Sequence, residues 1–201
     1  MEKMINNIQI IEKPDWISWN DIHSLLWAAH AENREKGIFM KYPSLSGEDI
    51  RKRVESKGKL LCAIFNGKLV GTGAIIYKES KLWFDKPSST YMYFCFIGVL
   101  PEYKGKGIYK SLYLSLLREN NGLDKILLDT HEDNKHMIEI STKNGFVPVD
   151  YKYYKNHYNV VMVKWLNECP YTIFRCKYEF IKIKFFVKLK YSAKRLLQKL
   201  K

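Results

Sequence analysis

Residues 99–110 read Val99-Leu-Pro-Glu-Tyr-Lys-Gly-Lys-Gly-Ile-Tyr-Lys110, and this segment is the most informative part of the sequence. It follows an apolar run, residues 91–99, that predicts a β-strand, and it opens an amphipathic run, residues 108–117, that predicts a helix. A glycine-rich turn at a helix start forms an anion site. Glycines let the backbone approach a ligand closely, and the free N–H groups of the first helical turn attract phosphate oxygens. We therefore predict that this loop, with its three lysines, holds a phosphorylated cofactor.

The spacing of the glycines narrows the choice of cofactor. The string G-x-x-x-x-G-K-[ST] is absent, and the dinucleotide fingerprint G-x-G-x-x-G lacks its third glycine because Lys110 stands there. The stretch instead resembles the acyl-CoA loop of the GNAT acetyltransferase superfamily, [Q/R]-x-x-G-x-[G/A] after a strand ending in V-x-P-E-[Y/F]. Lys104 stands at the basic first position and Gly107 at the central glycine. Tyr109 departs from the small residue that is usual at the last position.

A second motif follows in the expected order. An apolar run at residues 123–129 predicts another strand, and the segment after it resembles the GNAT pattern N-x-x-A-x-x-L-[Y]-x-x-x-G-[F]. Four positions match in register: Asn134, Ile140, Gly145 and Phe146. Two depart from the pattern, because Met137 replaces the usual alanine and Ser141 stands where many members have a tyrosine.

The resemblance implies an α/β (α+β) fold with a mixed, mostly antiparallel central sheet flanked by helices, over roughly residues 8–166. The remaining patterns agree with this layout. Helical periodicity predicts helices at residues 20–34, capped by Asn20 or Asp21, and at 48–55. Asn66-Gly67 predicts a type I′ turn between two strands, and two later strand-like runs predict a closing hairpin. The predicted strands of the two hairpins are residues 60–65, 68–77, 149–154 and 159–165. We divide the chain into an acyltransferase domain, residues 1–170, and a tail, residues 171–201.

The resemblance also implies an activity, transfer of an acetyl or other acyl group from acyl-CoA to a primary amine of a small acceptor, with acetyl-CoA as donor and no metal. The backbone N–H of Val99 is the group that would polarise the thioester carbonyl. The residues implied in cofactor binding are Val99, Lys104, Gly105, Lys106, Gly107, Ile108, Tyr109, Lys110, Asn134 and Ser141. An alternative is a non-catalytic module that binds acyl-CoA or acts as a scaffold associated with a membrane or nucleic acid.

The sequence identifies the residues that would transfer protons in such a reaction less clearly than it identifies the cofactor loop. An attacking ammonium must lose a proton, since its ordinary pKa is about 10, and the leaving thiolate should gain one. The strand at residues 91–99 carries no carboxylate or histidine, which leaves His131 as the candidate base beside Asp129 and Glu132. Ser141 is a poor acid, so Tyr109, Tyr153, Tyr154 or a water is left to protonate the thiolate. The alternative for His131 is a loop residue that faces solvent.

Aromatic residues are frequent in the two segments that border the acceptor site in GNAT proteins. Aromatic rings suit sugars, nucleobases or aryl amines, and the scarcity of acids disfavours a polyamine, so we favour an amino sugar, or a sugar linked to a nucleotide or lipid. The residues are Trp16, Trp19, Trp27, His30, Phe39, Met40 and Tyr42, and Tyr151, Tyr153, Tyr154, His157 and Tyr158.

Length and composition limit the class of protein and the compartment that can be expected. The chain has 201 residues and 46% hydrophobic residues, enough for a full core. No apolar run reaches the roughly 18 residues that span a bilayer, and no signal-peptide pattern opens the sequence, so we expect a cytoplasmic protein. Four cysteines without a C-x-x-C pair predict reduced thiols rather than disulfides or a zinc site.

The tail differs from the rest of the chain in charge. The net charge is +13, and residues 171–201 carry ten Lys or Arg residues against the single acid Glu179, a net charge of +9. Residues 181–185 alternate like a strand, but helical periodicity gathers apolar residues on one side and most lysines on the other. Such a helix fits an anionic membrane surface, with the enzyme peripheral at the membrane, or packing on the domain or in a homodimer. Nucleic acid is a disfavoured partner.

Overall fold

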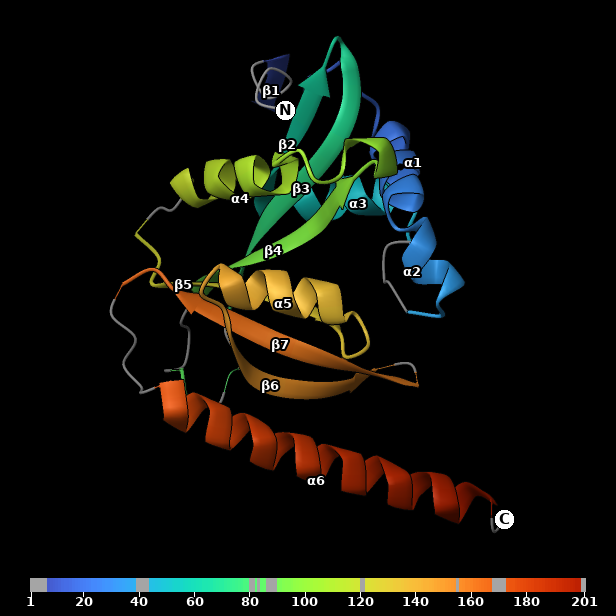
Figure 1. The fold of residues 1–201 in the computed structure, drawn as a ribbon, viewed down its shortest axis with the longest axis vertical. Helices are drawn as coiled ribbons and strands as arrows, with labels where there is room; N and C mark the ends of the chain where they lie inside the picture. The colour runs from blue at the N-terminus through green and yellow to red at the C-terminus, as the bar shows by residue number, and fades with distance from the viewer. Residues whose placement is uncertain are drawn as a thin grey trace. The chain divides into compact units, whose positions relative to one another are not determined.

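Figure 1 shows the computed structural model, which describes residues 7–38, 44–79, 82, 84–85, 90–119, 122–154, 156–167 and 173–199. Residues 194–199 are described by their backbone alone. The chain divides into two compact units. Unit 1 comprises Met1–Ser80 and Pro87–Leu123, and unit 2 comprises Lys81–Lys86 and Asp124–Lys201.

The described residues of unit 1 include four antiparallel strands in chain order: β1 (Ile8–Glu12), β2 (Gly58–Phe65), β3 (Lys68–Glu79) and β4 (Thr90–Val99). Its helices are α1 (Trp19–Ala29), α2 (Ala31–Glu35), α3 (Gly47–Glu55) and α4 (Ile108–Arg118), with the short 3-10 helix η3 (Pro101–Tyr103). Alternation along β2 sets the two faces of this sheet. Cys62 packs with α1 and α3 in one core cluster, whereas Ala63 points to the face where Ile108 of α4 lies.

Three details of unit 1 differ from the sequence-based expectation. The cap of α1 is Ser18, whose Oγ accepts the N–H of Asp21 at 3.1 Å while the Asp21 carboxylate accepts the N–H of Ser18 at 2.8 Å. The single helix expected over residues 20–34 breaks at His30, which leaves the helical region with φ −114° and separates α1 from α2. Strand β1 was not predicted, because its five residues become a strand only by pairing with the edge of β2.

The hairpin between β2 and β3 confirms the expected turn. Phe65 pairs with Lys68 across a two-residue loop. Asn66 and Gly67 have φ values of 48° and 74°, and positive φ at both positions is what a type I′ turn requires.

The described residues of unit 2 include three antiparallel strands, with β7 (His157–Trp165) between β5 (Lys125–His131) and β6 (Val147–Tyr154). Two helices complete it, α5 (Lys135–Lys143) and α6 (Ile173–Lys199). The seven strands and their helices confirm the mixed, mostly antiparallel fold. The start of β5 is fixed by a buried ion pair, in which Lys125 Nζ lies 2.5 Å from Asp85 Oδ1.

The basic tail forms one helix, so the strand-like interpretation of residues 181–185 is wrong. Helix α6 packs on β6 within unit 2 (Figure 1). Cys176 is fully buried, the ring of Phe180 meets Tyr151 edge-on at 6.1 Å, and Tyr191 stacks on Tyr153 at 4.0 Å. The predicted boundary at residues 170 and 171 lies outside the described residues. Among the helices of the described ranges, none combines the length and the apolar character needed to cross a membrane.

A hydrogen-bonded ion cluster joins α6 to the end of β5. Glu132 accepts a hydrogen bond from Tyr151 Oη at 2.5 Å and lies 3.1 Å from Lys188 Nζ and 3.9 Å from Lys184 Nζ. Burial acts to raise the pKa of Glu132, but the Tyr151 hydrogen bond and the two lysines outweigh it, so the pKa lies below the usual value. Glu132 is therefore charged at neutral pH and ties the helix down.

This cluster predicts a pH-dependent contribution to stability. A carboxyl with a lowered folded-state pKa stabilises above its unfolded pKa, and the contribution disappears as the pH falls through the folded value. Glu132→Gln is expected to lower the free energy of unfolding by about 1 to 2 kcal/mol at pH 7. Urea unfolding of wild type and variant across acidic pH should show this difference shrinking. A difference that stays constant with pH would contradict the role of the Glu132 charge.

Candidate active site

Strand β4 carries a bulge just before its end. Cys95 pairs with Ala74 and Gly98 pairs with Thr72, so Phe96 and Ile97 both lie opposite Gly73. Phe96 has φ 50°, a left-handed conformation that is uncommon for a residue other than glycine. The bulge redirects the last residues of β4, including Val99, which still pairs with Gly71.

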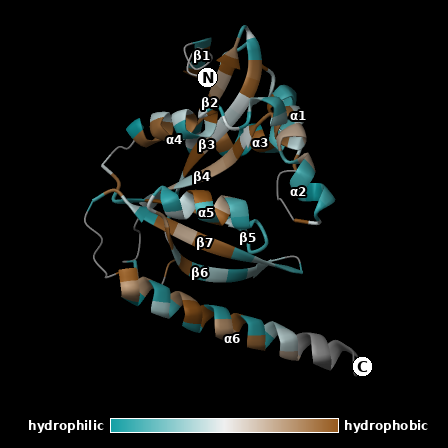
Figure 2. Ribbon diagram, in the orientation of Figure 1, coloured by the Kyte–Doolittle hydropathy of each residue, from teal (hydrophilic) through white to brown (hydrophobic). Residues whose placement is uncertain are grey.

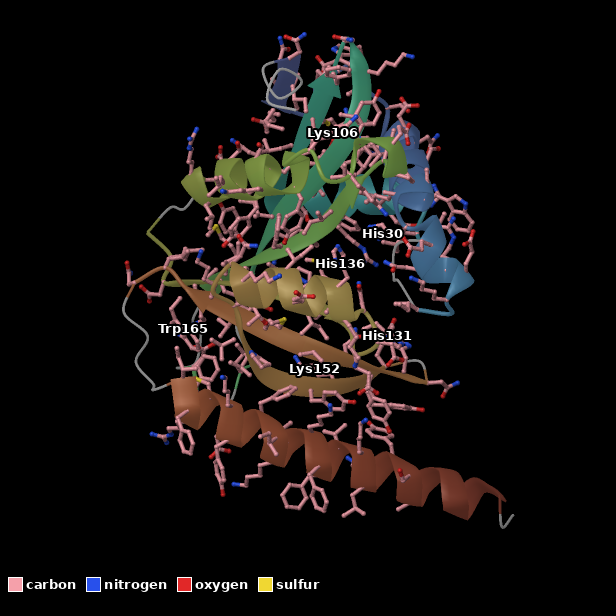
Figure 3. The ribbon with its side chains drawn as sticks, in the orientation of Figure 1. His30, Lys106, His131, His136, Lys152 and Trp165 are labelled. Atoms are coloured by element: carbon pink, nitrogen blue, oxygen red, sulfur yellow. The ribbon has the colours of Figure 1, made fainter. Side chains whose placement is uncertain are left out.

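His30 holds this bulge from the end of α1 (Figure 3). Its Nε2 lies 2.6 Å from the carbonyl oxygen of Ile97, and its Nδ1 lies 3.3 Å from Asn33 Nδ2. Burial lowers the pKa of His30, and the charges of Lys104 and Arg34 lower it further against the effect of the Ile97 bond. The neutral ring thus donates Nε2–H to Ile97 and accepts from Asn33. This positioning role was not foreseen, since nothing in the sequence marks Phe96 for a positive φ.

The loop after β4 leaves the first turn of α4 open. Gly105 and Gly107 have φ values of 76° and 75°, and Gly107 is the N-cap, with no side chain capping the helix. The first intrahelical bond runs from the N–H of Ser111 to the carbonyl of Gly107 at 3.0 Å, so the N–H groups of residues 108–110 have no partner within the helix. A Cβ built on either glycine meets no atom within 4 Å. The loop therefore combines open space with converging N–H donors, which fits the pyrophosphate of CoA.

The lysines of the loop add positive charge to these donors. Lys104 and Lys110 are exposed. The Nζ atom of Lys106, which is labelled in Figure 3, lies 4.8 Å from the centre of the Tyr103 ring. Glu102 is the only acid in residues 99–110, so the loop keeps a net positive charge beside its N–H groups.

Tyr109 and Ile108 contribute to the site through their backbone. The Tyr109 ring packs against Phe94 at 6.3 Å and stacks parallel to Tyr113 at 6.4 Å. Its hydroxyl is buried, has no hydrogen-bond partner within the described chain, and has its pKa raised by burial. Ile108 is a core residue with 2% of its surface exposed. Only the N–H groups of these two residues remain for an anion, and the Tyr109 phenol is poorly suited to give up a proton.

In unit 2, the two residues predicted to be catalytic, His131 and Tyr154, both contact the ring of His157. His131, at the end of β5, is buried and stacks on His157 with ring centres 5.3 Å apart (Figure 3). Tyr154, at the end of β6, meets the His157 ring edge-on at 5.7 Å and is partly exposed. His131 is thus not a solvent-facing loop residue. His157 belongs to this cluster, although the sequence marked it only as one aromatic among several.

The hydrogen bonds of His131 define its tautomer. Nδ1 accepts the N–H of Asp133 at 3.1 Å, which places the proton of the neutral ring on Nε2. The other two nearby acids are engaged elsewhere: Asp129 accepts from Asn159 Nδ2 at 3.0 Å, and Glu132 is tied to α6. No three His, Cys, Asp or Glu side chains in the described ranges are arranged to hold a metal ion.

Asn134 and Ser141 shape helix α5. Asn134 is its N-cap: Oδ1 accepts the N–H of Met137 at 3.3 Å and Nδ2 donates to Thr130 Oγ1 at 3.1 Å. Ser141 is fully buried, and its Oγ has no hydrogen-bond partner in the described chain. Both side chains are therefore buried rather than on an open surface, and Asn134 caps the helix.

The aromatic residues proposed for the acceptor divide into two groups. Tyr151 stacks on Tyr158 at 5.2 Å, Tyr153 lies tilted against Tyr158 at 5.0 Å, and side chains of α6 contact Tyr151 and Tyr153. In unit 1, Trp16 and Trp27 remain exposed. Phe39, Met40 and Tyr42 lie outside the described residues.

The comparisons with known proteins agree with this geometry. The model of the acetyltransferase (GNAT) family matches residues 19–146. An acetyltransferase of the GNAT family from Streptococcus agalactiae superposes with a TM-score of 0.62 at 19% identity, over 80% of this chain and 96% of that one. No curated protein matches this sequence.

Two further solved structures carry ligands. A GNAT family acetyltransferase from Elizabethkingia anophelis with acetyl-CoA bound superposes with a TM-score of 0.55 at 16% identity, over 80% of this chain and 99% of that one. Arabidopsis thaliana NAA60 in complex with a bisubstrate analogue gives a TM-score of 0.55 at 17% identity, over 80% of this chain and all of that one. The chain belongs to the acetyltransferase (GNAT) family, a class that transfers acyl groups from acyl-CoA.

Proposed function

We propose that this protein transfers the acetyl group of acetyl-CoA to a primary amine of a small acceptor. The observation that carries the proposal is the uncapped N-terminus of α4 behind two left-handed glycines, where an added Cβ meets open space. In this proposal the N–H groups of residues 108–110 bind the pyrophosphate, helped by Lys104, Lys106 and Lys110.

The end of β4 is proposed to bind the thioester group of acetyl-CoA. Bound acetyl-CoA supplies an activated thioester whose carbonyl carbon accepts the amine. The N–H of Val99, redirected by the bulge at Phe96, is proposed to donate to the thioester oxygen and stabilise the negative charge that develops there. His30 would act as a positioning residue, because it fixes the bulge through the Ile97 carbonyl.

We assign proton transfer to His131, with Tyr154 as the acid for the leaving thiolate. An imidazole is the side chain whose ordinary pKa lies nearest neutrality. Nδ1 of His131 accepts a hydrogen bond from the backbone N–H of Asp133. If Nδ1 took up a proton, it would lose this bond and would donate instead to the Asp133 carboxylate, whose Oδ2 lies 3.6 Å away. Asn134 and Ser141 are proposed to support the cofactor through the placement of α5.

For the acceptor we favour an amino sugar. Trp16 and Trp27 of unit 1 and Tyr154 of unit 2 are exposed aromatic side chains, and such rings pack well against the apolar faces of sugars. We place the reaction in the cytoplasm because Cys62 and Cys95 are free thiols, which a reducing compartment preserves.

The test is release of the CoA thiol from acetyl-CoA with a panel of amines: amino sugars, sugar nucleotides carrying an amino group, polyamines and peptides with a free N-terminus. Turnover is expected, with amino sugars preferred over polyamines. Tight CoA binding without turnover of any amine would overturn the enzymatic proposal in favour of a binding module. Turnover of peptides or polyamines alone would retain the reaction and overturn the acceptor.

A further inference from the structure

Helix α6 has apolar residues on two sides, and only one side is covered. The side that faces β6 carries Cys176, Phe180, Ile183, Val187 and Tyr191, which are buried or half-buried. Both the contacts of Phe180 with Tyr151 and those of Tyr191 with Tyr153 lie on this side. The remaining apolar residues of the helix are therefore not required for its packing in unit 2.

The uncovered side forms a continuous stripe, which we call the α6 stripe. At 100° per residue, Phe174, Tyr178, Ile181, Phe185 and Leu189 fall within an arc of about 80°. Their exposed fractions are large: Phe174 80%, Ile181 66%, Phe185 64%, Tyr178 59% and Leu189 57%. Figure 2 shows the apolar segments recurring along α6. Five large side chains left in water along one helix face mark an interaction site, whereas single exposed apolar residues need no explanation.

Basic residues border the stripe on both sides. Lys177, Lys184 and Lys188 follow one edge, Lys182 lies at the other edge with Lys190 farther round the helix on that side, and Glu179 is the only acid in the helix. Both edges keep charged groups accessible, since Lys182 is 54% exposed and Lys188 is 45% exposed at the side chain. An apolar strip between two rows of lysines matches a lipid surface, in which the acyl region takes the apolar side chains and anionic headgroups take the ammonium groups.

We infer that the α6 stripe is a docking surface for an anionic lipid bilayer, with α6 lying in the plane of the interface between β6 and the lipid. A second copy of the chain fits less well. Pairing two stripes would bring together two helices that each carry nine Lys or Arg residues and one acid, and like charges repel. Nucleic acid would use the lysines but leave the five apolar side chains without a partner.

The experiment is co-sedimentation of the full chain with vesicles of phosphatidylcholine alone or mixed with phosphatidylglycerol. Binding is expected only to the mixed vesicles, and it should weaken as salt rises, since salt screens the attraction of lysines to headgroups. The triple variant Ile181→Gln/Phe185→Gln/Leu189→Gln, confined to the exposed side, should bind at least tenfold more weakly. Its helix content by circular dichroism and its turnover of acetyl-CoA in solution should remain those of wild type.

Matched controls separate the stripe from general effects. Ile11→Gln/Leu114→Gln removes exposed apolar side chains from unit 1 and should not change vesicle binding. Lys182→Gln/Lys190→Gln should weaken binding more than Lys57→Gln/Lys68→Gln, which removes the same charge from exposed positions of unit 1. Absence of binding to the mixed vesicles would overturn the inference. So would wild-type binding by the triple variant, or a stripe-dependent dimer or RNA complex formed without vesicle binding.

Discussion

Replacing Gly107 with Val is expected to weaken CoA binding at least tenfold, about 1.4 kcal/mol. Gly107 has φ 75° and caps α4 with open space where its Cβ would stand. A valine side chain would occupy that space and would also disfavour the left-handed backbone, so the N–H groups of the first turn could no longer converge on a phosphate. Isothermal titration calorimetry with CoA measures the effect directly.

A matched control separates loss of the site from backbone strain. Gly67 has φ 74° and equally open space at its Cβ, but it lies in the β2–β3 hairpin. Gly67→Val should therefore lose similar stability and keep the CoA affinity of wild type. Unchanged affinity in folded Gly107→Val would remove the pyrophosphate from this loop.

Replacing His131 with Ala should lower kcat at least about 30-fold, because a well-placed general acid or base typically contributes roughly 10² to 10⁴ in rate. The buried imidazole between Asp133 and His157 would be lost from the His131–His157–Tyr154 cluster. Steady-state kinetics across pH provide the measurement. If His131 acts as the base, the acidic side of the kcat/KM profile should lose an inflection, because a base is inactivated by protonation.

Ser141 provides the contrasting case. Its hydroxyl is a poor proton donor at neutral pH and is sealed in the core, so Ser141→Ala should lose less than about tenfold in kcat. Full activity with an unchanged pH profile in His131→Ala would transfer the role to Tyr154, His157 or an ordered water.

Several features were predictable because their causes are local. Gly105 and Gly107, between a strand and a helix, indicated a left-handed turn before α4, and both have positive φ in the structure. Asn66-Gly67 determines a type I′ turn through its tolerance of positive φ. The periodicity of the tail predicted a helix that the structure confirms, and the two motifs in series indicated the family.

Other features depended on contacts between distant residues. The bulge at Phe96 is paired against β3 and held by His30, 66 residues earlier in the chain, and a phenylalanine gives no local sign of a left-handed conformation. Glu132 and Tyr151 resembled site residues in sequence, yet they bind the two lysines of α6 and each other.

The tail, residues 171–201, gives the clearest contrast between features with a local cause and features that depend on distant contacts. A basic helix with apolar residues could be predicted from the amino-acid order, because helical periodicity and charge are properties of the local chain. Which apolar residues meet β6 and which remain in water depends on how the helix packs in unit 2. Burial depends on the shape of the surface that the helix meets, and that surface is formed by β-strands elsewhere in unit 2.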